Sequence, residues 1–499
     1  MPLPDKVLIT NISALRAKYG TAGVERIKAD ADRLIAADAA RGLVTRLVAV
    51  DDGRTARQLG VPPVRDAADP VAAKRTIDAI ADLWNPAYLV LLGSDDVIPT
   101  QPLKNPLYQP GPTSMDDDLV VESDLPYASE HPYSERISDF RGVTRVVGRI
   151  PDGQSNKSTG QLRTALRTAA GYIQRPRANY DRPWALSVAD WHYSTSQTLT
   201  KIFGSAATLI DVPPTNKLRP GDTHRLLHLF NCHGASNRPQ MKGQRGWYYE
   251  VVMNPKDLLR PGLLNEGTIV ASECCYTGKM VAPNVKSGPA FVDVYMRSGA
   301  YAFVGSSTEV WGGIDYNADA DLLVGYFVRH LMDGMSTGRA MLQARHEYVI
   351  RNAVLSPTDL KTLGQFALFG DPSIHPVATG RVPIEPGVEL ARGLRSRRAR
   401  LSDHGRSLHA TTPHAGEVPI GVPAKDHDVL LAEMRAQTGH KFGAAAESRR
   451  FPVHAPGARR PTPGRHFDVV HETSERGTHA ALVRMEDGVA EELRLLQRR

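Results

Sequence analysis

The sequence predicts an α/β protein built around a parallel sheet that helices cover. In the first 150 residues, helical and strand patterns alternate twice. Apolar residues at helical spacing over 22–40 precede the buried strand pattern of Val44–Val50, and an amphipathic stretch at 71–84 precedes Tyr88–Leu92. Alternation of this kind is typical of a parallel sheet in which helices connect the strands.

A second α/β unit follows the first along the chain. A helical pattern at 158–174 begins it, and Ser336 is a candidate N-cap for one of its later helices. Short apolar strands are predicted at 185–189, 225–230, 268–271 and 300–305, and helices at 286–298, 319–332 and 337–352. The sequence therefore predicts a sandwich of two similar subdomains.

The chain divides into four parts. We expect a supporting α/β subdomain at 1–155, a second and larger subdomain at 156–378, a linker rich in Arg and Pro at 379–424, and a small extension at 425–499. The extension is expected to be partly disordered, with a few short strands or a helix near its end. The last 120 residues contain 20 Lys and Arg against 15 Asp and Glu, so they account for most of the net charge of +7.

The composition is that of an ordinary soluble protein, and it excludes a fibre or a membrane protein. No apolar run approaches the roughly 20 residues that span a bilayer. The first ten residues lack the basic flank and apolar segment of a signal peptide, so we expect a cytoplasmic protein, with secretion by another route left open.

The three cysteines point to a reactive site rather than to disulfides. They are Cys232, Cys274 and Cys275, too few and too clustered for a disulfide framework. One apolar strand ends in Cys232-His233-Gly234 and a second ends in Cys274-Cys275. Active sites of parallel sheets form outside the carboxyl ends of the strands, so adjacent strands would bring the two ends together.

A cysteine and a histidine at neighbouring strand ends predict a hydrolytic dyad. The thiol needs a base to become a good nucleophile, and His233 supplies one. Gly234 lets a substrate carbonyl approach the backbone, where its N–H and that of Cys275 would form an oxyanion hole. Neighbours at a strand end point to opposite sides, and we assign Cys275 as nucleophile and Cys274 to inward packing.

These motifs resemble those of the caspase-like cysteine peptidases, in which one strand ends in His-Gly and another in Cys-x-x-Gly. Further segments are similar to the gingipain family in particular, and the resemblance covers about residues 25–378. They are Leu91–Pro99, Val147–Pro151, Gly299–Trp311 and Phe366–Ser373, in the family's order. The resemblance implies a caspase-like fold and a cysteine endopeptidase that works through an acyl-enzyme.

The resemblance also implies roles for single residues. Asp190 lies where gingipains carry the acidic residue that orients the histidine, and the alternative is that it caps a turn. No metal or organic cofactor is required, although calcium is an optional stabiliser of acidic loops in the family. Cys274 departs from the alanine usual before the nucleophile, and the segment from Asp190 to His233 looks shorter than in gingipains, so their preference for Arg is not carried over.

Three residues after a predicted strand are candidates for substrate binding. Glu309, Trp311 and Asp315 would line the pocket for the residue before the cleaved bond, and the alternative is that Trp311 simply packs. The loop 101–142, with its run Asp116–Asp118, is either a functional insertion or a solvated acidic loop.

Other classes of function are left as alternatives. A zinc site would use Cys232, His233, Cys274 and Cys275, but the usual ligand spacings are missing. A catalytically inactive scaffold, or a regulatory binding protein with a basic tail, is the second alternative. The arginines at 392–406 are interpreted as a solvated linker, an anchor for nucleic acid or acidic partners, or a site of self-cleavage. The expected partner is a protein or peptide substrate, with no membrane contact.

Overall fold

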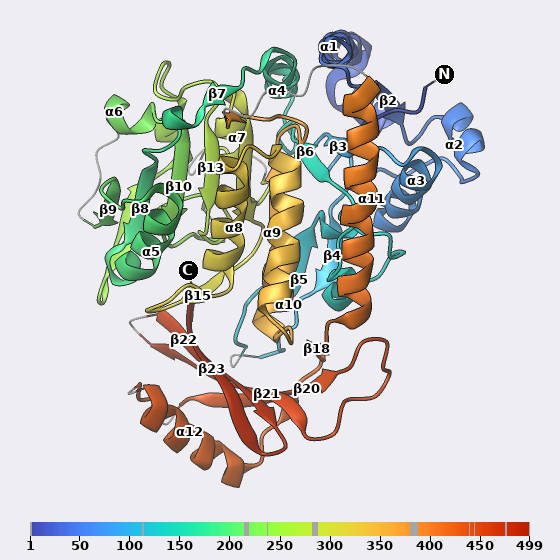
Figure 1. Cartoon of the computed structure of the whole chain (residues 1–499). Coiled ribbons are helices and arrows are strands. Elements are labelled where there is room, and N and C mark those ends of the chain that lie inside the picture. Colours follow the sequence, from blue (N-terminus) through green and yellow to red (C-terminus); the bar gives the residue numbers. More distant parts are fainter. Residues whose placement is uncertain are drawn as a thin grey trace.

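The protein consists of a large α/β body and a smaller region formed by residues 414–498 (Figure 1). The computed structural model describes residues 2–111, 114–213, 219–236, 238–281, 288–379, 388–438, 440–443, 445–474 and 477–498.

A ten-stranded sheet forms the centre of the body, in the order β2-β1-β3-β6-β16-β14-β13-β10-β8-β9. Every neighbouring pair is parallel except β14 and β16, which are antiparallel. The strands are β1 (Lys6–Thr10), β2 (Thr45–Ala49), β3 (Tyr88–Leu92), β6 (Val147–Ile150), β8 (Trp184–Val188), β9 (Leu209–Val212), β10 (Leu227–Asn231), β13 (Ile269–Ser272), β14 (Ala302–Ser306) and β16 (Phe366–Phe369). The prediction of an α/β fold with a mainly parallel sheet is confirmed.

The layout of two separate subdomains is not confirmed. One sheet runs through both halves, and its two sets of five parallel strands point in opposite directions because β16 pairs parallel with β6 but antiparallel with β14. The carboxyl ends of β8, β10, β13 and β14 therefore lie together at one edge of the sheet, away from those of the first half.

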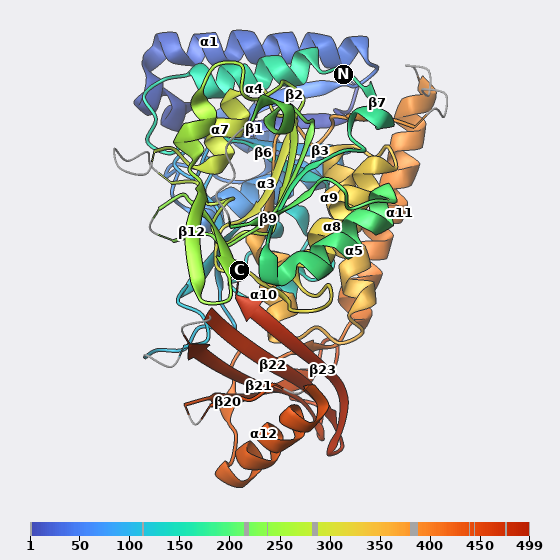
Figure 2. The same cartoon turned by 90° about the vertical axis from the view of Figure 1, so that its left-hand side faces the viewer.

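Helices cover both faces of the sheet (Figure 2). In the second half, α7 packs with one apolar cluster that includes Phe230 and Val270, and α8 packs with another that includes Leu229 and Ile269. Ser336 caps α9 as expected, since its side chain accepts from the backbone of Arg339. The helices of the body are α1 (Ile12–Ala40), α2 (Gly53–Leu59), α3 (Pro70–Trp84), α4 (Gly160–Gly171), α5 (His192–Phe203), α6 (Pro220–Thr223), α7 (Phe291–Arg297), α8 (Ala320–Met332), α9 (Thr337–Arg351) and α10 (Pro357–Gln365).

Shorter strands lie outside the large sheet. The hairpin of β11 (Met241–Arg245) and β12 (Tyr248–Met253) follows β10, and β15 (Trp311–Gly313) follows β14. The remaining pairs are β4 (Gln101–Lys104) with β5 (Val120–Ser123), and β7 (Arg175–Pro176) with β17 (Val377–Ala378).

A buried ion network joins the start of the chain to the Phe366–Ser373 motif. The Lys6 ammonium is fully buried and lies 2.5 Å from Asp38 and 2.6 Å from Asp371. Burial alone would lower the pKa of Lys6, but the two carboxylates outweigh it and raise the pKa. The charge of Lys6 therefore neutralises two carboxylates that are buried with it.

Removing this cation should destabilise the fold. We expect Lys6→Met to lower the free energy of unfolding by about 3–5 kcal/mol, because two buried carboxylates would face each other without a counter-charge. Urea denaturation followed by circular dichroism measures the loss. Lys28→Met is the control, since Lys28 pairs with Glu25 at the surface and its loss should cost under about 1 kcal/mol. Equal stability of the Lys6→Met and Lys28→Met proteins would contradict the role of Lys6 as the counter-charge of the two buried carboxylates.

The last quarter of the chain is folded over most of its length, so a partly disordered basic tail is not confirmed. The helix α11 (Val388–Thr411) crosses the predicted linker and packs on the body, where Ser402 donates to the carbonyl of Thr144 at 2.8 Å. The remaining elements are β18 (His414–Ala415), β19 (Ile420–Gly421), α12 (Ala424–Thr438), β20 (Glu447–His454), β21 (Arg465–Ser474), β22 (Gly477–Glu486) and β23 (Val489–Arg498).

The strands of this last quarter form an antiparallel sheet that also includes β15 of the body. Of the arginines at 392–406, Arg406 pairs with Glu130 of the body at 2.7 Å. The side chains of Arg392, Arg395, Arg397 and Arg398 lie outside the described residues. In the part of the chain that the structure covers, no helix has the length and apolar character needed to cross a membrane.

Candidate active site

The predicted strand ends meet at one edge of the sheet. β10 and β13 are neighbours, with Phe230 beside Ser272, so the residues that follow them are brought together. The closeness is greatest at Gly234, where an added β-carbon would lie 1.8 Å from the carbonyl oxygen of Cys275. Only glycine fits against the Cys275 backbone, which explains the glycine after His233.

Cys275 is held in a tight turn at the end of β13. The next residue, Tyr276, has a φ of 59°, a conformation that residues other than glycine rarely adopt. The Cys275 Sγ accepts a hydrogen bond from the backbone N–H of Val310 at 3.0 Å. Burial raises the pKa of the Cys275 thiol, and the negative charge of Glu309 raises it further, so the sulfur is protonated in this state.

Cys274 and Cys275 lie on opposite faces of the sheet. Cys274 and Cys232 belong to the apolar cluster under α7, where the Cys274 Sγ accepts from the backbone N–H of Cys232 at 3.2 Å. Cys275 belongs to the cluster on the other face. Cys274 therefore packs inward, and the four ligands of the alternative zinc site do not converge.

The imidazole of His233 is fixed by aromatic rings and by Gln244. Its ring lies 4.6 Å from that of Trp191 and 5.2 Å from that of Tyr249. His233 Nε2 is 2.6 Å from Gln244 Oε1, while Gln244 Nε2 donates to the carbonyl of Gly246 at 2.6 Å. Because both carbonyl oxygens only accept, a neutral imidazole in this contact carries its hydrogen on Nε2.

Asp190 lies at the strand end that the resemblance implied, and its role as the acid that orients His233 stays a prediction. It lies just after β8, and its carboxylate accepts from the backbone N–H of Gly246 at 3.1 Å. The side chain hydrogen-bonded to His233 Nε2 is Gln244, two residues before Gly246. Asp190 thus holds the hairpin that carries Gln244.

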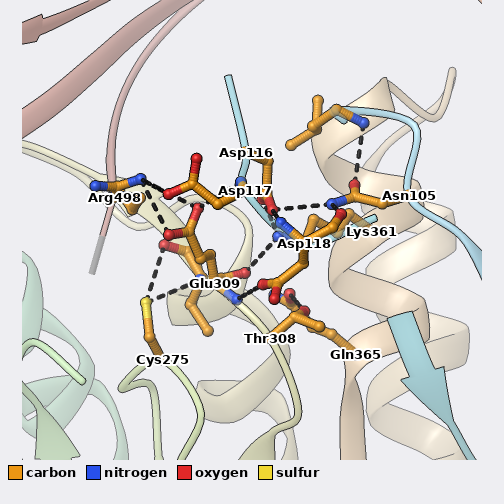
Figure 3. Close-up of polar contacts among 12 residues, drawn as sticks. Asn105, Asp116, Asp117, Asp118, Cys275, Thr308, Glu309, Lys361, Gln365 and Arg498 are labelled. Carbon is orange, nitrogen blue, oxygen red and sulfur yellow. Dashed lines mark hydrogen bonds and ion pairs between the residues drawn. The ribbon is translucent and has the colours of Figure 1, made fainter. Parts of the chain in front are cut away.

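Four carboxylates form an acidic cluster on the other side of Cys275 (Figure 3). Asp118 accepts from the backbone N–H of Glu309 and from the Tyr276 hydroxyl, both at 2.9 Å, so it ties the acidic loop to the cysteine turn. The members of the cluster are Asp116, Asp117, Asp118 and Glu309. Asp116 is therefore buried and Asp118 is held by hydrogen bonds, while Asp117 is exposed.

Two cations neutralise this cluster from opposite sides. Lys361 is buried, pairs with Asp116 and donates to the carbonyl of Glu309 at 2.8 Å. Arg498 lies 3.0 Å from the Glu309 carboxylate and 3.6 Å from that of Asp117. Burial and the charge of Asp116 nevertheless raise the pKa of Glu309 to about 7.

The other two substrate-binding candidates lie apart from each other. Trp311 is 1% exposed and packs with apolar residues of the last sheet, so its ring is part of a core. Asp315 is exposed on the turn between β15 and α8. Of the three candidates, only Glu309 presents a side chain beside Cys275.

The described residues offer no ready metal site. Within the ranges that the structure covers, no three His, Cys, Asp or Glu side chains are grouped so that they could hold a metal ion. The acidic cluster, where calcium would be sought, is already paired with Lys361 and Arg498.

Sequence reasoning missed two residues of this site. Gln244 reaches His233 because the β11–β12 hairpin folds back and Lys242 pairs with the backbone of His233. Arg498 arrives from the last strand, 189 residues beyond Glu309. Neither position follows from a spacing or a motif, so no local signal would have found them.

Comparison with known proteins supports the class of cysteine peptidases. Residues 232–377 match the model of Peptidase family C25, and this segment contains His233, Cys275 and Glu309. The resemblance to gingipain-like peptidases that the motifs implied is confirmed. No protein among the curated sequences matches this chain.

Comparison with solved structures returned matches of low sequence identity. One, described as the structure of a protease, is 12% identical, with 99% of this chain and 96% of that chain covered and a TM-score of 0.45. Two crystal structures of the Saccharomyces cerevisiae separase–securin complex, at 3.0 and 2.6 Å resolution, are 10% and 12% identical. Each covers 47% of this chain and 14% of the other, with TM-scores of 0.29 and 0.27.

Proposed function

We propose that this protein is a caspase-like cysteine endopeptidase with Cys275 as nucleophile and His233 as general acid and base. The observation that carries the proposal is the contact of Gly234 with the Cys275 backbone, because it joins the two strand ends that bear the thiol and the imidazole. The match of residues 232–377 to Peptidase family C25 favours this function over an inactive scaffold or a regulatory binding protein.

The first half of the reaction forms an acyl-enzyme. The Cys275 thiol is protonated because its pKa is raised, so it must lose its proton as the sulfur attacks the peptide carbonyl. His233 Nδ1 takes that proton, and the backbone N–H groups of Gly234 and Cys275 bind the oxyanion. The C–N bond then breaks, and His233 gives the proton to the leaving amine.

The second half of the reaction releases the new carboxyl end. A water molecule attacks the thioester while His233 takes one of its protons, and the proton returns to sulfur as the C–S bond breaks. Gln244 keeps the ring in the tautomer that presents Nδ1 throughout, and Asp190 supports Gln244 through Gly246. This is the role that an orienting acid has in other triads.

Glu309 and the backbone of β15 at Trp311 are the proposed contacts of the substrate. β15 begins one residue after Val310, whose N–H touches the Cys275 sulfur, so a peptide paired with β15 would bring a carbonyl to the nucleophile. Asp315, which is exposed on the following turn, has no proposed part in catalysis.

Cytoplasmic location stays a prediction.

Peptide cleavage and covalent labelling test this proposal. The protein is incubated with a peptide library, and the products are identified by mass spectrometry. We expect cleavage within peptides, and labelling of Cys275 by an acyloxymethyl ketone that carries the preferred sequence. An intact library together with no labelling of native protein would disprove a peptidase function.

Gln244 is testable as a positioning residue. We expect Gln244→Ala to lower kcat by about 10²-fold with little change in KM, because the imidazole loses its orientation but the substrate contacts remain. Gln244→Glu should recover activity and move the acid limb of the kcat profile to higher pH by about 1 unit, because a carboxylate stabilises the protonated imidazole. An unmoved acid limb in Gln244→Glu would mean that Gln244 acts only through packing.

A further inference from the structure

The end of β23 lies along the strand that leads away from the catalytic cysteine. β23 pairs antiparallel with β15, with Arg498 opposite Trp311, Gln497 opposite Gly312 and Leu496 opposite Gly313. The opposite edge of β15 is also taken, because Gly312 forms a bridge with Asp319. A further strand can therefore pair with β15 at this point only where β23 now lies.

Arg498 also occupies the side-chain position beside the nucleophile. Its guanidinium reaches the acidic cluster at Glu309 and Asp117, and its charge acts on the Cys275 thiol. Figure 3 shows Arg498 and Cys275 on either side of the Glu309 carboxylate. The neighbouring Gln497 accepts from the indole N–H of Trp191 at 2.7 Å, and Trp191 packs on His233. Consecutive residues of β23 thus contact the surroundings of both Cys275 and His233.

Both groups of the proposed dyad are buried in this state. Cys275 is 3% exposed and His233 is 9% exposed. A substrate peptide needs space for its backbone beside the Cys275 sulfur. Neither the Cys275 thiol nor the His233 imidazole is open to solvent in this state.

We propose that the end of β23 is an intramolecular occupant of the peptide-binding edge, so that the protein holds its own active site closed until Gln497 and Arg498 leave β15. The proposal rests on the proposed function, since it assumes that β15 is the edge where a substrate pairs. The occupant is an extended segment that adds a strand to β15 and places a basic side chain against the acidic cluster.

The contacts of β23 divide it into a fixed part and a releasable part. Arg494 is 7% exposed in its side chain and pairs with Asp359 at 2.9 Å, next to Asn352, so this part of β23 stays on the body. Arg498 is 31% exposed in its side chain and pairs with Asp117, which is exposed, and with Glu309, which is buried. Detachment beyond Leu496 breaks the ion pairs of Arg498 and the buried hydrogen bond between Gln497 and Trp191, and it frees the β15 edge beside Cys275.

The rate of alkylation of Cys275 tests the proposal without any need for catalysis. Full-length protein is treated with iodoacetamide, and modification is followed by mass spectrometry, with Cys275→Ala protein used to assign the site between Cys274 and Cys275. We expect Arg498→Glu to react at least about 10-fold faster than the wild type. The substitution removes the ion pairs of Arg498 and adds repulsion from Glu309, so it favours the state in which the end of β23 has left β15. Arg498→Lys, which keeps the charge, should stay near the wild-type rate.

Two controls separate the failure of this proposal from other failures. Arg465→Glu changes an arginine of the same sheet that pairs with Glu486, and it should leave the alkylation rate unchanged. A synthetic peptide copying residues 489–498 should slow alkylation of the Arg498→Glu protein. If native, folded Arg498→Glu protein reacts at the wild-type rate, β23 does not close the site. If it reacts faster but cleaves no peptide, the closure stands and the proposed peptidase function fails.

Discussion

Cys275→Ala protein should lose peptide cleavage, with kcat/KM at least about 10⁴-fold lower than that of the wild type. Without the sulfur no thioester forms, and a water molecule would have to attack the peptide directly. The fold should survive the change, because the methyl group still fills part of the apolar cluster that surrounds the thiol. Cleavage of a peptide from the library, measured in parallel with circular dichroism, gives the result.

The adjacent cysteine provides a matched control for this experiment. Cys274 lies on the other face of the sheet, so Cys274→Ala should keep activity within about an order of magnitude. The change should instead lower the free energy of unfolding by about 1 kcal/mol, because the backbone N–H of Cys232 loses the sulfur that accepts its hydrogen bond. Loss of cleavage in Cys274→Ala and its retention in Cys275→Ala would reverse the assignment of the nucleophile.

The parts of the site that could be predicted from the sequence are those fixed by strand geometry. The apolar runs before His233 and Cys275 are strands β10 and β13, and the carboxyl ends of parallel neighbours must lie at one edge. The alternation of side chains across a strand also predicts that Cys274 and Cys275 point to opposite faces of the sheet. These inferences use only local periodicity and the direction of the chain.

The parts that could not be predicted depend on contacts between distant segments. Gln244 was missed because the path of the β11–β12 hairpin over His233 has no signature in the sequence. The prediction of a partly disordered tail is not confirmed, for a similar reason. The segment 379–424 has few apolar residues, but the part that forms α11 is stabilised by contacts with the body such as that of Ser402 with Thr144.

The joining of the two halves into one sheet also could not be predicted from the sequence. β16 is a run of four residues, Phe366–Phe369, in a segment that the sequence marked only as a motif. Its antiparallel pairing with β14 joins the two predicted halves into one sheet. Pairing of strands far apart in the chain depends on the packing of the whole protein, and the local sequence pattern does not determine it.

Gly234→Ala should be the most damaging change that leaves every proposed catalytic side chain in place. The added methyl would lie 1.8 Å from the Cys275 carbonyl oxygen, so either the His233–Gly234 segment or the cysteine turn must move. A displacement of about 1 Å costs about 10²-fold in rate, and loss of an oxyanion donor costs about 10²- to 10³-fold. We therefore expect kcat to fall at least about 10³-fold.

Gly278→Ala is the control for the effect of a methyl group in the same motif. A β-carbon at Gly278 would lie 2.4 Å from the carbonyl oxygen of Gly305, so this change also strains the fold but does so away from the sulfur. Both variants should lose stability in thermal unfolding, and Gly234→Ala alone should lose activity beyond what its folded fraction explains. If the two variants keep equal activity per folded molecule, the approach of Gly234 to Cys275 is a packing contact and does not form part of the oxyanion site.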